Sequence, residues 1–154
     1  MKHLSFVLLV ALLLSPMTFA QEAPADNMAI LLEKIKADKK LLVADNMGLT
    51  EAEGKAFWPL YDAYQKDLQD IQMKYGKIIE RYAENYQKMT DEQAKGIVDD
   101  VLMMDGEHLK LRQAHLSKFR AAIPEVKVAR YYQIENKIRA VVNYELAALI
   151  PLMK

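Results

Sequence analysis

The sequence contains no cysteine, few glycines and prolines, and one tryptophan. Without cysteine there is no disulfide, no thiol nucleophile and no thiolate metal ligand. Glycine-rich phosphate-binding loops, the Gly-x-Ser-x-Gly turn of serine hydrolases, EF-hand loops and paired Cys/His zinc motifs are also missing from the printed sequence. We therefore expect a protein that is not an enzyme and that uses no cofactor.

The one compact apolar run lies at the N-terminus. A short basic start precedes apolar residues 4–14, and Thr18-Phe19-Ala20 then ends in a small residue. This is the layout of a secretory signal peptide, and the run is shorter than the roughly 20 residues that span a bilayer. We expect residues 1–20 to be removed, leaving a periplasmic domain of residues 21–154 without stable membrane insertion. An uncleaved membrane anchor is the alternative.

Charge is balanced overall but uneven along the chain. Residues 21–105 contain 11 basic and 17 acidic side chains, whereas residues 106–154 contain 9 basic and 4 acidic ones. The balanced total argues against nucleic acid as a partner. The asymmetry has two readings: the halves pair with each other inside one bundle, or the basic half attracts acidic or unfolded partners.

Apolar periodicity predicts an all-α protein with four helical segments. The first covers about residues 27–44, where Met28, Leu31, Leu32, Ile35 and Leu42 form one stripe. The others begin near residues 50, 90 and 124 and continue to about residues 89, 121 and 150. "DNMG" at residues 45–48 closes the first, because Asn and Gly tolerate a left-handed backbone.

Three short motifs mark the helix starts. In "LTEAE", Leu49 precedes the capping residue Thr50, and Glu53 can return a hydrogen bond to the Thr50 amide. In "MTDEQ", Thr90 and Gln93 form the same capping box. In "IPEVK", Pro124 suits the first helical position, where a missing amide costs nothing.

Two long apolar patterns describe how the helices should pack. The second segment has a heptad-like seam, defined by Phe57, Tyr61, Tyr64, Leu68, Ile71, Tyr75, Ile78, Tyr82, Asn85 and Met89. Such a seam packs lengthwise as in a coiled coil, and its length suggests that part of it meets a second subunit in a homodimer. The third segment has two adjacent stripes, one with Ile97, Val101, Met104 and Leu111, the other with Val98, Leu102, Leu109, Leu116 and Phe119.

Only two histidines, His108 and His115, follow residue 20. Met104 and His108 lie one turn apart and could share a soft metal ion, whereas His115 lies two turns, about 10.5 Å, beyond His108. These three residues are weak metal candidates. Their other interpretation is packing at a helix interface, so we expect no metal site.

The layout and the helix-start motifs resemble those of the Spy/CpxP class of small periplasmic proteins, which have Leu-Thr-x-x-Gln motifs. Here Leu49 and Thr50 match, Glu53 stands in place of the glutamine, and "AIPEV" keeps Pro124 and Glu125 of the second motif. The resemblance implies a cradle-shaped four-helix subunit in an antiparallel dimer. It also implies ATP-independent chaperone activity, envelope-stress regulation or metal sensing.

From these features we expect a chaperone-like protein that captures partly unfolded or envelope proteins through apolar and basic groups together. The candidate client-binding residues are Phe119, Arg120, Lys127, Arg130, Tyr131, Tyr132, Lys137 and Arg139. The alternatives are a regulatory subunit for a membrane sensor kinase and a periplasmic metal-binding sensor.

Overall fold

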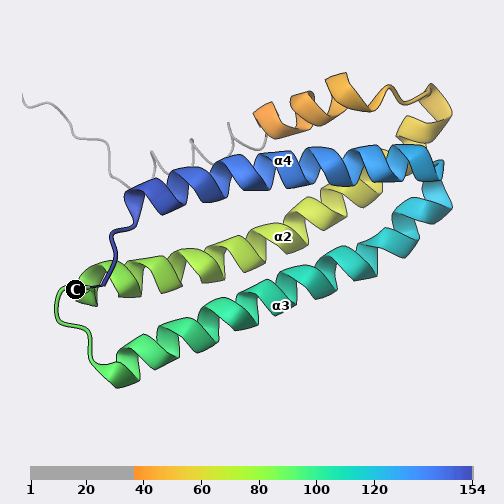
Figure 1. The fold of residues 1–154 in the computed structure, drawn as a ribbon. Coiled ribbons are helices and arrows are strands. Elements are labelled where there is room, and N and C mark those ends of the chain that lie inside the picture. Colours follow the sequence, from red (N-terminus) through yellow and green to blue (C-terminus); the bar gives the residue numbers. More distant parts are fainter. Residues whose placement is uncertain (1–36, 154) are drawn as a thin grey trace, which may run out of the picture. The chain divides into compact units, whose positions relative to one another are not determined.

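The computed structural model describes residues 37–153 (Figure 1). Contacts divide the chain into two units, Met1–Lys40 and Leu41–Lys154. Of the first unit only the helical residues 37–40 are described, so the predicted signal peptide and the Met28–Ile35 part of the predicted stripe lie outside the described residues. Leu42, the remaining member of that stripe, is exposed rather than buried. All regular secondary structure in residues 37–153 is helical, which confirms the all-α prediction.

Four helical segments make up the described chain. Residues 37–47 are helical and are followed by α2 (Glu51–Asn85), α3 (Asp91–Ala122) and α4 (Glu125–Leu149). Gly48 has a φ of 55°, the left-handed backbone that glycine adopts most readily after a helix end. The predicted left-handed closure is therefore present at Gly48, but residues 45–47 are still helical, so the helix ends about three residues later than predicted.

Both predicted capping boxes are present. The Thr50 hydroxyl accepts from the Glu53 amide at 3.3 Å, and the Glu53 carboxylate accepts from the Thr50 amide at 2.7 Å. At α3 the Gln93 amide donates to the Thr90 hydroxyl at 3.2 Å, and the Thr90 amide donates to the Gln93 side chain at 2.9 Å. Pro124 differs by one position from the prediction, because it is the N-cap with an extended ψ of 145° and α4 begins at Glu125.

Removing either cap should destabilise the fold measurably. We expect Thr50→Ala and Thr90→Ala each to lower the free energy of unfolding by roughly 0.5–2 kcal/mol, because the first helical turn loses an acceptor for its free amides. Urea denaturation followed by circular dichroism measures this. Thr50→Ser and Thr90→Ser keep the hydroxyl and serve as matched controls. Equal stability of the alanine and serine variants would contradict the capping role.

The predicted seam of α2 packs against α3 of the same chain. The helices are antiparallel, as shown by Lys74–Glu107 at 2.9 Å and by the ion pair between Arg81 and Asp100. Phe57, Tyr61, Tyr64, Leu68 and Ile78 of the seam are buried. Farther along, Ile71, Tyr75, Tyr82 and Met89 pack around the smaller core cluster of Ile78, Ile97 and Met104. The length of the seam is thus matched by α3, and its length alone no longer indicates a second subunit.

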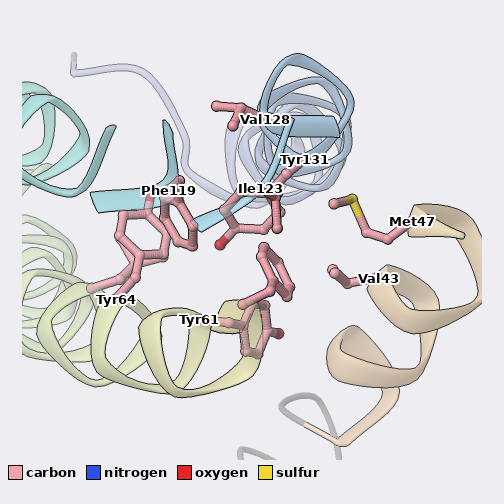
Figure 2. Close-up of a cluster of buried hydrophobic side chains, with 10 residues drawn as sticks. Val43, Met47, Tyr61, Tyr64, Phe119, Ile123, Val128 and Tyr131 are labelled. Atoms are coloured by element: carbon pink, nitrogen blue, oxygen red, sulfur yellow. The ribbon is translucent and has the colours of Figure 1, made fainter. Parts of the chain in front are cut away.

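The larger core cluster lies where all the described helices meet (Figure 2). It consists of Val43, Met47, Phe57, Tyr61, Tyr64, Leu68, Phe119, Ile123, Val128 and Tyr131. The Tyr131 ring of α4 lies 4.9 Å from the Phe119 ring of α3 and 5.1 Å from the Phe57 ring of α2, measured between centroids. Aromatic rings at these distances attract each other beyond simple burial, so this cluster fixes the beginning of α4.

Beyond the larger core cluster, α4 contacts α3 through Tyr132 and Arg139. The Tyr132 hydroxyl donates to the Arg112 carbonyl at 2.7 Å, and Arg139 Nη1 lies 3.3 Å from His108 Nδ1. Beyond Arg139, the large side chains Val141, Val142, Tyr144 and Leu149 are exposed. The chain returns to α2 where the Tyr82 hydroxyl donates to the Pro151 carbonyl at 2.6 Å.

Candidate binding surface

Three of the predicted client-binding cations are bonded to other residues of the chain, although Arg120 and Arg130 remain exposed. Arg120 donates twice to the Glu125 carboxylate, at 3.0 and 2.9 Å, and these hydrogen bonds raise the pKa of Arg120 above its ordinary value. Lys127 bonds the Glu53 carboxylate at 2.5 Å and the Gly48 carbonyl at 2.7 Å. Arg130 donates to the Asn46 carbonyl. These cations tie the start of α4 to the chain before it and do not form a free basic face.

The remaining two predicted cations lie about two turns or more farther along α4. Arg139 contacts His108 at 3.3 Å and the Asn136 side-chain oxygen at 3.4 Å. Lys137 is exposed and has no ion pair or hydrogen bond to any described residue. Only Lys137 of the five therefore keeps the freedom that was expected of a client-binding cation.

The predicted aromatic contacts fall mainly in the core. Phe119 and Tyr131 are fully buried, and burial raises the pKa of the Tyr131 hydroxyl far above its ordinary value. Tyr132 is half-buried, and Arg112 lies over its ring at 5.4 Å from the centroid. The expectation that Phe119 and Tyr131 face a client is wrong for this fold, because both rings lie in the core cluster where α2, α3 and α4 meet.

The weak metal candidates are not brought to one site. Met104 is buried in the smaller core cluster, and His108 is held by Arg139. Burial lowers the pKa of His108, and the neighbouring Arg139 and Arg112 lower it further. His115 is buried beside Asp67, and its ring lies next to Tyr64 and Phe119 of the larger core cluster. No group of three or more His, Cys, Asp or Glu side chains in residues 37–153 is arranged to hold a metal ion.

His115 is a buried polar residue between α2 and α3. Its Nε2 lies 3.2 Å from Asp67 Oδ2, and its ring packs edge-on against Tyr64 with centroids 5.4 Å apart. Its Nδ1 is buried with no hydrogen-bond partner among the described residues. Asp67 was not singled out in the sequence, although the antiparallel pairing of the two helices sets it opposite His115. The arrangement serves helix packing, as the packing interpretation of His115 expects.

Several exposed apolar residues of α3 and α4 form two stripes that the site prediction missed. The α3 stripe consists of Val98, Leu102 and Leu109, and the α4 stripe consists of Ile138, Val142 and Leu149 with the neighbouring Val141. Leu102 is 63% exposed and Leu149 is 77% exposed, whereas Ile138 is half-buried. The periodicity of α3 had placed Val98, Leu102 and Leu109 on one line. Large apolar side chains exposed in such rows mark interaction sites in soluble proteins.

The chain matches no protein-family model, no curated protein and no solved structure. Its likeness to the Spy/CpxP class therefore rests on the helix-start motifs and the layout. Across residues 37–153, no helix combines the length and the apolar character needed to cross a membrane.

The ion pair between Lys127 and Glu53 should make stability depend on pH. The hydrogen bond from Lys127, followed by that from the Thr50 amide, holds the pKa of the Glu53 carboxyl below its usual value of 4.5. A carboxyl whose pKa is lower in the folded state stabilises that state above its unfolded pKa. This stabilisation is lost as the pH falls through the folded-state pKa.

We therefore expect Glu53→Gln to lower the melting temperature at neutral pH, with a difference from wild type that shrinks as the pH falls below 4.5. Glutamine keeps the capping box, as Gln93 does at α3, so the variant removes mainly the charge. Thermal melts between pH 7 and pH 3 measure the difference. Glu51→Gln, at an exposed first-turn residue, is the control and should show a much smaller pH dependence. A Glu53→Gln difference that is constant with pH would contradict the assignment.

Proposed function

We propose that the protein is a non-catalytic, chaperone-like binding protein that reversibly holds apolar segments of partly unfolded proteins of the bacterial envelope without nucleotide. The observation that carries this proposal is the pair of apolar stripes on α3 and α4, where Leu102 and Leu149 are more than half exposed. Monomeric soluble proteins seldom expose contiguous apolar rows without a partner to cover them. The envelope location rests on the signal-like sequence of residues 1–20.

Holding by this surface would be mainly apolar. Arg120, Lys127 and Arg130 are engaged within the chain, so they contribute to the fold rather than to capture. Lys137 lies beside the α4 stripe and can assist encounter with acidic clients. Exposed charges of this kind act on the association rate and are screened by salt, with a Debye length near 8 Å at physiological ionic strength.

Light scattering of a chemically denatured client, diluted into buffer with and without the protein, tests the proposal. We expect the wild-type protein to suppress aggregation and the double variant Leu102→Ser/Leu149→Ser to lose most of this effect. The matched control is Val126→Ser/Met73→Ser, which removes two exposed apolar side chains outside the stripes, 81% and 51% exposed in the wild type. Circular dichroism confirms that the variants stay folded.

Two results would overturn the proposal. One is absence of suppression by the folded wild-type protein at a molar excess over client. The other is an equal loss of suppression in the control variant, which would mean that clients are held by exposed apolar residues in general rather than by the two stripes. Repeating the assay with divalent metal ions separates the metal-sensor alternative, because only that alternative requires the effect to change with metal.

A further inference from the structure

The two exposed stripes share the same spacing along their helices. Val98, Leu102 and Leu109 are separated by four and seven residues, and so are Ile138, Val142 and Leu149. Four-and-seven spacing sets each row along one side of a helix, in the register that coiled-coil partners use. Each stripe is therefore shaped to receive another helix lengthwise, and each matches the other in length.

The charges around the two stripes have opposite signs. Residues 98–109 of α3, which carry the stripe, contain four acidic side chains and no basic one, a net charge of −4. Two of the four, Asp100 and Glu107, already pair with Arg81 and Lys74 of α2. Residues 137–149 of α4 contain Lys137, Arg139 and Glu145, a net charge of +1. Pairing α3 with α3 would set two strongly acidic surfaces against each other. Pairing α3 with α4 joins opposite charges, and electrostatic complementarity of this kind selects the partner.

Within one copy the two stripes do not cover each other. The contacts of α4 with α3 begin at Glu125 and Tyr131 and extend along α4 as far as Arg139, which lies at the level of His108. Beyond them, the Tyr82–Pro151 hydrogen bond attaches the end of the described chain to α2 rather than to the first half of α3 (Figure 1). Val98, Leu102 and Leu109 stay exposed, as do Val142 and Leu149.

We infer that a second copy of this chain covers both stripes. Residues 138–149 of α4 in each copy pack on residues 98–109 of α3 in the other, which gives two equivalent contacts related by a two-fold axis. The pairing goes beyond the proposed function and does not depend on it. The pairing has one consequence for the proposed function. The surface proposed to hold clients is covered in the dimer, so a client must displace the second copy.

Sedimentation equilibrium of the mature chain tests the pairing. We expect a concentration-dependent monomer–dimer equilibrium whose Kd rises at least tenfold in Leu102→Glu and in Leu149→Glu. Val126→Glu is the matched control, since Val126 is an exposed apolar residue of α4 outside the stripe, and its Kd should equal that of wild type. A wild-type protein that stays monomeric at all concentrations, or a Val126→Glu variant that dissociates equally, would overturn the inference.

Cysteine cross-linking identifies which helices meet, because the natural chain has no cysteine to interfere. Leu102→Cys and Val142→Cys are each near the middle of a stripe. When the two single variants are mixed with a short bis-maleimide, we expect the 102–142 species to exceed the 102–102 and 142–142 species. Predominance of same-position species would overturn the inference. So would a double-cysteine chain that cross-links within one copy and forms no dimer.

These outcomes are separate from those of the client assay. A monomer that still suppresses aggregation removes the pairing and leaves the proposed function standing. A pair that forms as described but never holds a client removes the proposed function and leaves the pairing standing. With both in place, the cross-linked 102–142 dimer should suppress aggregation less than the same mixture without cross-linker.

Discussion

Phe119→Ala should lower the free energy of unfolding by about 3–5 kcal/mol, the cost of truncating a fully buried aromatic ring. The ring is completely buried, with its centroid 5.5 Å from that of Phe57 and 4.9 Å from that of Tyr131. The substitution leaves a cavity where α2, α3 and α4 meet, and native proteins of this size have only about 5–15 kcal/mol of stability to lose. Urea denaturation followed by circular dichroism measures the change.

Met103→Ala is the control for this experiment. Met103 lies on the same helix and is 53% exposed, so its truncation should change stability by no more than about 0.5 kcal/mol. If Phe119→Ala were equally mild, the ring would not be part of the core. The interpretation of Phe119 as a client contact, which the fold now contradicts, would then return.

Helix starts could be predicted because the interactions that make them are local. Thr50 and Glu53 are three residues apart, as are Thr90 and Gln93, so the capping boxes follow from the sequence without knowledge of the tertiary fold. The α2 seam was also readable, because its period is a property of one helix. What it packs against depends on the whole chain: within this chain the seam packs on α3 along its length and, in its first half, also on α4.

Which apolar stripe of α3 is buried could not be predicted. Ile97 and Val98 are neighbours of similar shape and hydrophobicity, yet Ile97 is buried in the smaller cluster and Val98 is exposed. The difference arises because α2 covers one side of α3, while α4 reaches only the later part of it. The direction in which α4 leaves the bundle is set by contacts far apart in sequence, such as Tyr61 with Tyr131 and Tyr82 with Pro151.

The candidate client-binding residues were misjudged for the same reason. Phe119 and Tyr131 lie 12 residues apart in sequence, and the α3–α4 turn brings their ring centroids to 4.9 Å from each other. Lys127 and Arg130 form hydrogen bonds with residues 46–53, and these contacts could not be predicted from any local sequence pattern. The uneven charge along the sequence was real, and part of it is used within the chain: Lys127 of the basic half pairs with Glu53 of the acidic half.

Ile97→Asp should cause a large loss of folding stability, because it places a charge at a buried apolar position of α3. Its side chain is only 7% exposed and packs against Ile78 and Met104. Arg81 lines the same small pocket as Ile97, but it is already paired with Asp100. We expect a loss of roughly 4 kcal/mol or more at neutral pH, since an unpaired buried charge is among the costliest single changes. Urea denaturation at pH 7 measures this loss.

Lowering the pH should partly restore Ile97→Asp. Burial raises the pKa of an aspartate above its unfolded value of about 3.9. The loss of stability is therefore greatest at pH values above the folded-state pKa, and it shrinks as the pH falls and the carboxyl takes up a proton. Denaturation at pH 3 should therefore show a smaller difference from wild type than at pH 7. A difference that does not narrow on acidification would mean that the aspartate has reached solvent.

Val98→Asp is the adjacent matched variant, and it separates folding from association. In the single copy Val98 is exposed, so the monomer should lose no more than about 0.5 kcal/mol and show little dependence on pH. In the proposed pair the same aspartate would lie under the partner's α4, so dissociation should become easier while the fold persists. Denaturation at low protein concentration, beside sedimentation at high concentration, distinguishes the two. If Val98→Asp unfolds the dilute protein as severely as Ile97→Asp does, then α3 is covered on both sides within one copy and no free stripe is left for a second copy or a client.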